Sequence, residues 1–431
     1  MLSRRAFLYR TGAVGAAALA VRPRDLDAVL EASASVASQS PADVAKDEFY
    51  WREIQQAFDL DRTLINLNTG HHCSQPRIVV NAVKRYLDME NMAPVYYGGQ
   101  LNRGLEPMRK AIADEFGCDA DELAITRNAS ESLQILQNGV DLKAGDEIVT
   151  TEQDYPRMLT TWDQRMRRDK IVVNRVQFPV PATFDDLYTR IEQAITPRTK
   201  VLHFCHITNL SGQLFPVQRL CRMARTRGIR TIVDGAHAGG QFPFKLRELE
   251  CDAYGVSLHK WLLAPLGTGI LFVKRDVIPT IWPLQAAPAT SDTDIRKYEE
   301  IGTAPAAVKA AIADALAFHQ GIGIERKAAR LHYLTMRWAN ALRPLPRIRL
   351  HSSFKPGETW GVGAVGIDGM EPAKITSFLW DKYRIIVAGL AGGQLPAQRY
   401  DWTGIRVTPN VYTTIGEVDA FIGAMHELVK T

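Results

Sequence analysis

Short runs of valine, isoleucine and leucine alternate with longer segments of mixed polar and apolar residues from about position 66 to position 274. Several of these runs are bounded by Gly, Pro or Asp, as expected of strands that are buried on both faces. The pattern predicts an α/β fold in which a mainly parallel sheet has helices on both sides. The predicted core strands are 122–126, 147–150, 170–176, 200–205, 230–234, 253–257 and 269–273.

Beyond this sheet the pattern predicts a smaller α/β unit. Residues 304–322 are rich in alanine and are predicted to form one long helix that links two domains. Further expected elements are helices at 106–116, 326–342 and 417–429 and strands at 347–351 and 361–367. We therefore expect an N-terminal arm and large domain over 47–310 and a small C-terminal domain over 311–431.

The amino terminus carries a pattern of a different kind. Arg4 and Arg5 precede Phe-Leu and an uncharged Ala/Gly-rich run at 12–21, which resembles a twin-arginine export signal. The run is too short to predict a stable membrane span, and an amphipathic or frayed terminus is the alternative. Cleavage after Ala20, Ala34 or Ala37 fits the sequence. We expect residues 1–46 to be a signal peptide and linker, with the twin-arginine translocon as a partner and a periplasmic or secreted location.

Composition narrows the class of protein. The chain has 431 residues, of which 46% are hydrophobic and 23% are charged, so it is long enough for two globular domains and is not disordered. Its net charge of +5 is small and its basic residues are scattered, which disfavours a nucleic-acid partner. Five cysteines without CxxC spacing disfavour a disulfide framework and a zinc site.

Two residues near the middle of the chain indicate the chemistry. Asp234 ends one predicted strand, and Lys260 follows the next strand among small and hydroxyl residues. Pyridoxal phosphate needs a lysine amine for a Schiff base and a carboxylate at its ring nitrogen, and these two residues supply both groups. Because acids are common at strand ends and most lysines are solvated, the cofactor prediction depends on further residues.

A phosphate site is predicted where a strand meets a helix. Asn128, Ala129 and Ser130 lie at this junction, where free backbone N–H groups and the helix dipole favour an anion. Ser257 and His259 flank the lysine and can donate to the same phosphate. A plain helix cap is the alternative for Asn128.

Five ordered segments resemble class V of the fold-type I pyridoxal phosphate enzymes, which includes cysteine desulfurases, selenocysteine lyases and isopenicillin N epimerase. The segments are 126–131, 234–237, 257–260, 302–303 and 406–414. The resemblance extends over about residues 66–429 and implies the fold-type I transferase fold. Asp-Gly-Ala-His-Ala-Gly at 234–239 and Tyr155 after Glu-Gln-Asp are most similar to the epimerase branch.

The resemblance implies a role for each matching residue. Lys260 would form the Schiff base and move protons at the substrate's alpha carbon, and Asp234 would hold the pyridinium. His237 would lie near the phenolic oxygen of the cofactor. Tyr155 would stack on the ring with Asn209 beside it. Capping or packing is the alternative for Tyr155 and Asn209.

Two further sites follow from the same resemblance. Gly302 and Thr303 match the position at which a partner subunit reaches the cofactor phosphate, which implies a homodimer with shared active sites. Arg406 matches the arginine that binds the substrate's alpha-carboxylate, and a guanidinium can donate two parallel hydrogen bonds to that group. As isolated residues they would be interpreted as a loop, a helix cap and a surface arginine.

The cysteines depart from the desulfurase pattern. Desulfurases of this class take up sulfur on a loop cysteine that lies well past the lysine, whereas the last cysteine here is Cys251. Cys73 lies in an N-terminal loop, and its role stays open because the sequence shows nothing that would stabilise a thiolate.

The sequence therefore predicts a pyridoxal phosphate enzyme that acts at the alpha carbon of an amino acid or small peptide and is similar to isopenicillin N epimerase. Epimerisation, transamination and elimination share the first step, and the residues leave all three open. A carbon–sulfur lyase acting on a cysteine derivative is one alternative. A pyridoxal phosphate-binding protein without turnover is the other.

Overall fold

The computed structural model describes residues 24–392, 398 and 400–431. Its largest element is a seven-stranded sheet in the order β2-β8-β7-β6-β5-β3-β4. All neighbours pair in parallel except β8, which is antiparallel to β2 and β7. The strands are β2 Leu123–Thr126, β3 Glu147–Thr151, β4 Val172–Val176, β5 Thr199–Cys205, β6 Arg230–Asp234, β7 Ala253–Ser257 and β8 Gly269–Val273. The predicted mainly parallel seven-stranded sheet is confirmed.

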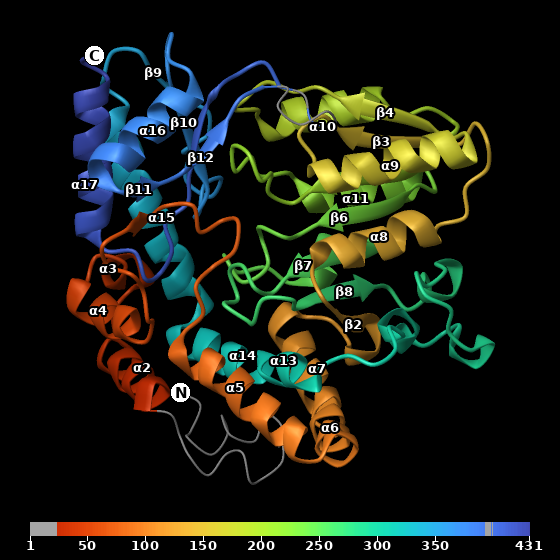
Figure 1. Ribbon diagram of the computed structural model, residues 1–431. Helices are drawn as coiled ribbons and strands as arrows, with labels where there is room; N and C mark the ends of the chain where they lie inside the picture. The colour runs from red at the N-terminus through yellow and green to blue at the C-terminus, as the bar shows by residue number, and fades with distance from the viewer. Residues whose placement is uncertain (1–23, 393–397, 399) are drawn as a thin grey trace.

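Alternate residues of these strands enter two different cores. Leu202 and Val233 pack on one face of the sheet with helices α7, α10 and α11, while Val201 and Ile232 pack on the other face with α8 and α9. Figure 1 shows α8 and α9 on the face turned to the viewer. The helices are α7 Leu105–Phe116, α8 Ala129–Gly139, α9 Pro156–Asp169, α10 Phe184–Gln193, α11 Val217–Thr226 and the short α12 Leu246–Leu249. Burial on both faces explains why the central strands are rich in apolar residues, whereas the edge strand β4 is partly exposed and contains Asn174 and Arg175.

A second sheet forms the centre of the smaller unit, drawn in blue in Figure 1. Its antiparallel strands lie in the order β12-β13-β10-β9 and share a core with α15, α16 and α17. The bounds are α15 Ile324–Leu342, β9 Ile348–Leu350, β10 Gly363–Ile367, α16 Pro372–Tyr383, β11 Ile385–Ile386, β12 Ala388–Leu390, β13 Gly404–Val407 and α17 Ile415–Leu428. Strand β1, Ile65–Asn66, pairs in parallel with β11 and so attaches the N-terminal arm to this unit.

The alanine-rich segment predicted as one helix is two. Helix α13 spans Ala306–Ala310 and helix α14 spans Ile312–Ile322. Alanines of α13 pack with α5 (Arg77–Met92) and α6 (Pro94–Arg103), whereas α14 contributes to the large core. Helix α5 contacts both pieces, but α13 also packs with α6, while α14 packs into the core of the larger unit, so their surroundings differ at the break.

The expectation of a polar linker up to residue 46 is wrong for residues 24–46. This segment forms helices α2 (Arg24–Ser35) and α3 (Pro41–Val44) and is followed by α4 (Glu48–Gln56). Val29 is fully buried, and Ser33 donates a 2.7 Å hydrogen bond from Oγ to the carbonyl of Gly321 in α14. Leu26, Val29, Leu30 and Ser33 recur at helical spacing, so the Ala/Ser-rich composition concealed an amphipathic helix.

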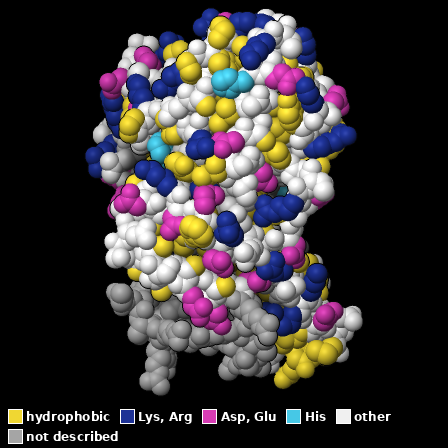
Figure 2. All heavy atoms as spheres, turned by 90° about the vertical axis from the view of Figure 1, so that its left-hand side faces the viewer, with side chains coloured by type: hydrophobic (Ala, Val, Ile, Leu, Met, Phe, Trp, Pro, Cys, Tyr) yellow, Lys and Arg dark blue, Asp and Glu magenta, His cyan; other side chains and the backbone are white. Residues whose placement is uncertain are grey.

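The paired arginines and the apolar run at 12–21 lie outside the described residues. In the part of the chain that the structure describes, no helix has both the length and the apolar character needed to cross a bilayer. On the side of the molecule seen in Figure 2, Lys and Arg side chains are interspersed with Asp and Glu.

Candidate active site

Asp234 and Lys260 meet at the carboxyl edge of the large sheet. Asp234 is the last residue of β6, and Lys260 lies three residues beyond the end of the neighbouring strand β7. Asp234 is 4% exposed and accepts a 2.9 Å hydrogen bond at Oδ1 from the backbone N–H of Ala236. Burial raises the pKa of Asp234 to about 6, and burial lowers the pKa of Lys260 to about 8. Each charge acts on the pKa of the other group, although the described residues show no direct ion pair between them.

His237 contacts the lysine amine directly. The distance from Lys260 Nζ to His237 Nε2 is 3.0 Å. Burial, with the lysine charge adding to it, holds the pKa of His237 well below its usual value, so the imidazole is neutral. A neutral imidazole that accepts at Nε2 carries its proton on Nδ1, and Nδ1 is buried without a partner among the described residues.

The predicted phosphate site is the start of α8. Asn128 is the N-cap, and its Oδ1 accepts a 2.8 Å hydrogen bond from the backbone N–H of Glu131, so this residue does act as a helix cap. Ser257 Oγ accepts a 3.0 Å hydrogen bond from the N–H of Ala129, which ties the helix start to the end of β7. Ser130 is half-buried. The site therefore offers a helix N-terminus and two hydroxyl groups to an anion.

His259 is a weaker hydrogen-bond donor to a phosphate than the sequence predicts. Its Nδ1 lies 3.2 Å from the carbonyl oxygen of Thr268, to which it donates. Burial together with the charge of Lys260 lowers the pKa of His259 to about 4. A neutral His259 then presents an acceptor at Nε2, so it donates to a phosphate only after gaining a second proton.

Arg406 is a buried cation without an acid partner in the described chain. It lies on β13 and is 6% exposed. Its Nη1 donates to the carbonyl of Asn209 and its Nη2 donates to Oδ1 of Asn68, both at 2.7 Å, while Nε has no partner among the described residues. Burial lowers its pKa to about 10, so the guanidinium stays charged at neutral pH. An uncompensated buried charge is costly, which favours an anionic ligand here.

Tyr155 and Asn209 lie beside this arginine. Tyr155 is the half-buried N-cap residue of α9, and its hydroxyl is close enough to influence the pKa of Arg406. Asn209 accepts a hydrogen bond from Arg406 at its carbonyl and a 3.4 Å one at Oδ1 from Nε2 of Gln398. The site thus contains residues of both units.

Sequence reasoning missed Asn68 and His71 of the N-terminal arm. Residue Asn68 pairs with Thr408 in a β-bridge and orients Arg406. His71 is only partly shielded from solvent, and this partial desolvation together with the charges of His72, Arg406 and Lys260 lowers its pKa. The sequence singles out the loop 68–73 for its cysteine alone, and contacts with the distant residues Thr408 and His259 place it at the border of the site.

Gly302 and Thr303 are exposed and make no hydrogen bond to Lys260, Asp234 or Ser130 within the described residues. Gly302 has a φ of 73°, and no atom lies within 4 Å of the position that a Cβ would take. The structure therefore does not bring these two residues to the site of their own chain.

Cys73 is not a reactive thiol. It is buried, and its Sγ accepts a 2.9 Å hydrogen bond from Nδ2 of Asn410. Burial raises its pKa to about 12, so it remains a neutral thiol. Its role as a nucleophile therefore has no support.

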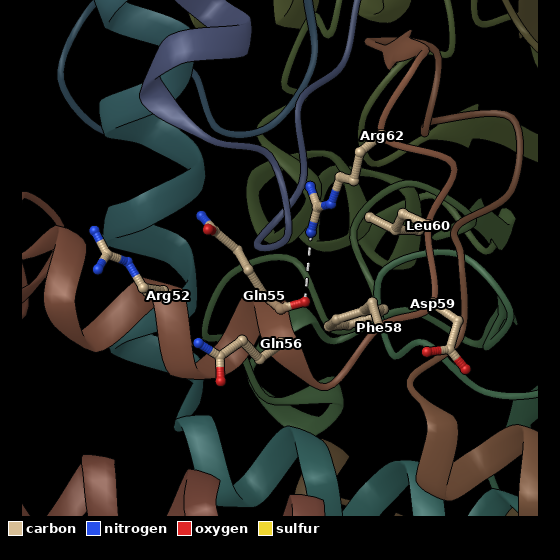
Figure 3. A pocket seen from close by; sticks show the side chains of 7 residues that line it. All are labelled: Arg52, Gln55, Gln56, Phe58, Asp59, Leu60 and Arg62. Atoms are coloured by element: carbon tan, nitrogen blue, oxygen red, sulfur yellow. Dashed lines mark hydrogen bonds between the residues drawn. The ribbon is translucent and has the colours of Figure 1, made fainter.

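A separate hollow lies in the N-terminal arm, where Arg62 donates to the carbonyl of Gln55 (Figure 3). It is lined by Arg52, Gln55, Gln56, Phe58, Asp59, Leu60 and Arg62, none of which is a predicted site residue. Within residues 24–392, 398 and 400–431, no group of three potential metal ligands comes together.

The sequence profile of the family "Aminotransferase class-V" matches residues 74–421. The chain belongs to this family. It is therefore a class V enzyme that depends on pyridoxal phosphate. The match lies within the region 66–429 over which the motifs extend.

Relatives of this class V enzyme have more than one named activity. It is 30% identical to an isopenicillin N epimerase of Amycolatopsis lactamdurans over 88% of its own length and 99% of the relative. It is 26% identical to a probable cysteine desulfurase of Vibrio cholerae over 85% of its length and 94% of the relative. The apo structure of a cysteine desulfurase from Thermococcus onnurineus NA1 superposes with a TM-score of 0.76, at 22% identity over 88% of this chain and 98% of that chain, and supports the fold.

The donor groups of the site fit pyridoxal phosphate. A carboxylate (Asp234) suits the ring nitrogen, an amine (Lys260) suits the aldehyde, and the start of α8 suits the phosphate. Arg406 is separate from these cofactor groups and suits a substrate carboxylate. These groups come together although they lie far apart in the sequence.

Proposed function

We propose that this class V enzyme acts at the alpha carbon of an amino acid, or of a small peptide with a free alpha-amino acid group, and that its reaction is epimerase-like. The observation that carries the proposal is Arg406, a buried cation whose contacts in the described chain are a carbonyl and an amide oxygen, on the same site as Lys260. The similarity to an isopenicillin N epimerase over nearly the whole of that relative supports the epimerase-like reaction.

Each side chain has a defined task in this proposal. When bound, pyridoxal phosphate supplies an electron-withdrawing ring that favours breaking a bond at the substrate's alpha carbon. Lys260, with a pKa of about 8, exchanges a proton near neutral pH, and His237 orients its amine through the 3.0 Å contact. Asp234, at the end of β6, would hold the protonated ring nitrogen. Arg406 orients the substrate through its carboxylate.

A carbon–sulfur lyase acting on a cysteine derivative is the second candidate. The similarity to a probable cysteine desulfurase supports it. Transfer of sulfur to a protein cysteine is disfavoured, because no cysteine follows Cys251 and all five cysteines are buried. Such a lyase would therefore release its sulfur product into solution.

The test is a screen of amino acids and short peptides with the purified holoenzyme in deuterated water. We expect deuterium at the alpha carbon and inversion of configuration without fragmentation, and neither with Lys260→Ala. Release of sulfide together with pyruvate or an amino acid would replace the epimerase by the lyase. A protein with the cofactor's visible band but without exchange on any substrate would be a binding protein without turnover.

We further propose that the enzyme is a homodimer in which Gly302 and Thr303 reach the partner's cofactor phosphate. Their exposure in the single chain supports this, because among the described residues they make no hydrogen bond to Lys260, Asp234 or Ser130. Met92, Val95 and Tyr96, at the junction of α5 and α6, are 71%, 94% and 62% exposed. Exposed apolar side chains of this kind are typical of an interface.

We also propose export through the twin-arginine pathway. The support is the pattern of Arg4, Arg5 and the apolar run at 12–21. This pathway carries folded proteins, which suits an enzyme that takes up its cofactor in the cytoplasm.

A further inference from the structure

Lys327 is a fully buried lysine whose amine contacts the backbone next to Lys260. It lies on α15 and is 0% exposed. Its ammonium donates to the backbone carbonyl of Trp261 and, at 3.2 Å, to Nδ1 of His319. No carboxylate contacts it in the described residues, and burial lowers its pKa to about 7. A methionine of similar length would fill this space without the cost of burying an amine.

His319 connects this lysine to an acid on a third helix. The ring lies on α14, and its Nε2 is 3.4 Å from Oε1 of Glu115 on α7. Nδ1 accepts from Lys327, so the ring proton is on Nε2 and points at the carboxylate. Burial opposes ionisation of Glu115, but hydrogen bonds from His319 and Gln320 lower its pKa to about 2. Cys73, a neutral thiol, is the remaining titratable group that acts on the lysine.

The carbonyl held by this chain belongs to the loop that carries Lys260. The loop is closed by hydrogen bonds from the N–H of Leu263 to the carbonyl of Lys260 and from the N–H of Ala264 to the carbonyl of Leu258, both at 3.1 Å. Leu263 is fully buried and has a φ of 66°, a left-handed conformation that a leucine rarely adopts. Such a conformation persists only where the surroundings fix it.

The ring of Trp261 lies next to His237, the residue that contacts the lysine amine. The ring lies edge-on to His237, with centroids 6.4 Å apart, and His237 contacts Lys260 Nζ. Displacement of Trp261 would therefore move both the backbone of Lys260 and the imidazole that orients its amine.

We propose that Lys327, supported by His319 and Glu115, is a positioning residue for Lys260 that acts by holding the carbonyl of Trp261. The proposal rests on the proposed role of Lys260 as the residue that binds pyridoxal phosphate. In this role Lys327 acts through Trp261 and not on the cofactor or the substrate.

The test compares Lys327→Met with a matched control in the full-length holoenzyme. Lys297 is also buried, and its ammonium donates to the carbonyls of Ile278 and Asp292 at 2.8 and 2.9 Å, but within the described chain it makes no hydrogen bond to the loop of Lys260. Lys297→Met therefore removes a buried lysine that holds carbonyls elsewhere. Thermal unfolding of both variants measures their structural effect.

Three readouts report on the position of Lys260. The first is the pH midpoint of the cofactor's visible band without substrate, and the second is the fraction of cofactor that borohydride attaches to Lys260, read by peptide mapping. For Lys327→Met we expect a midpoint shift on the order of one pH unit and less cofactor on Lys260. The third is turnover: kcat should fall on the order of 10-fold or more with little change in KM, because a reacting group is displaced. Lys297→Met should match the wild type in all three.

Equal readouts for Lys327→Met and Lys297→Met would overturn the inference. If Lys327→Met does not fold, Glu115→Gln decides the question, because it removes only the charge at the partly exposed end of the chain. We expect it to shift the band midpoint in the same direction but by less, and an unshifted midpoint would refute the proposal. A wild-type protein without a visible band would instead refute the proposed function, so the two failures are distinguishable.

Discussion

Lys260 must lose its proton before it can add to an aldehyde. Burial lowers its pKa to about 8, so the uncharged amine becomes the major form only above that pH. We expect cofactor-free protein to capture pyridoxal phosphate at a rate that rises with pH, passes a midpoint near 8 and then levels off. Stopped-flow absorbance of the visible band measures this rate. A midpoint near 10.5, the ordinary lysine value, would show that the amine is not desolvated. The Lys260→Ala variant should capture none and serves as the control.

Replacement of Arg406 should weaken substrate binding and leave cofactor binding unchanged. Replacement by lysine keeps the positive charge but loses the planar pair of donors, so we expect KM to rise on the order of 10-fold or more. The visible band and the cofactor affinity should stay unchanged. Arg349 on β9 of the same sheet pairs with Asp368 at the surface, and Arg349→Lys is the control. Equal losses of cofactor and substrate affinity in Arg406→Lys would exclude the carboxylate role.

At this scale the sequence predicted the residues that belong to recognisable motifs. An acid at the end of a buried strand, followed by a lysine, is visible in one dimension. Asn68 and Lys327 were not predictable, because their importance comes from contacts with Arg406 and Trp261, which lie far away in the sequence. The direction of the hydrogen bond at His259 was equally hidden, since it depends on the backbone of Thr268.

Helix α2 determines which of the proposed cleavage points is compatible with the fold. Its Val29 is fully buried, Ser33 bonds to Gly321, and Asp25 forms a 2.7 Å ion pair with Arg77. Cleavage after Ala34 or Ala37 would remove this helix, whereas cleavage after Ala20 would keep it. Amino-terminal sequencing of the exported protein should therefore find a start before Arg24.

Removal of helix α2 should lower the stability of the protein. Protein that begins at Gln39 lacks the buried side chains of Val29 and Val36, each worth about 1.5–3 kcal/mol of unfolding free energy. Its midpoint of chemical denaturation should be lower than that of protein beginning at Arg24. Equal midpoints would mean that α2 contributes nothing to the folded state, and a mature start at Ser35 or Ser38 would then be acceptable.

The elements differ in how far sequence predicts them. The strands of the large sheet were predictable because most of them are buried on both faces and rich in apolar residues, and only the edge strand β4 is mostly unburied. The break between α13 and α14 was not predictable, because the alanines around it favour a helix and the two pieces differ in packing, α13 with α6 and α14 in the core of the larger unit. The arm was mistaken for a linker because its small residues conceal the apolar stripe of α2.

At the scale of the whole molecule, the single chain provides most of the proposed site, but it leaves Gly302 and Thr303 exposed and uninvolved. Shared sites would explain this, because each cofactor would be held by Lys260 of one subunit and Thr303 of the other. A glutamate at position 303 would then repel the phosphate of the neighbouring site. We expect Lys260→Ala and Thr303→Glu homodimers both to be inactive, the first without covalent cofactor and the second with weak cofactor binding.

Mixing these two inactive proteins under conditions that exchange subunits discriminates shared from separate sites. A hybrid dimer pairs the intact Lys260 of one subunit with the intact Thr303 of the other in one of its two sites. Because half of randomly mixed dimers are hybrids, we expect about a quarter of the wild-type activity to return. If Thr303 served its own subunit, every site in the mixture would carry a defect and no activity would return. The Lys260→Ala protein mixed with itself is the control for recovery caused by the exchange procedure.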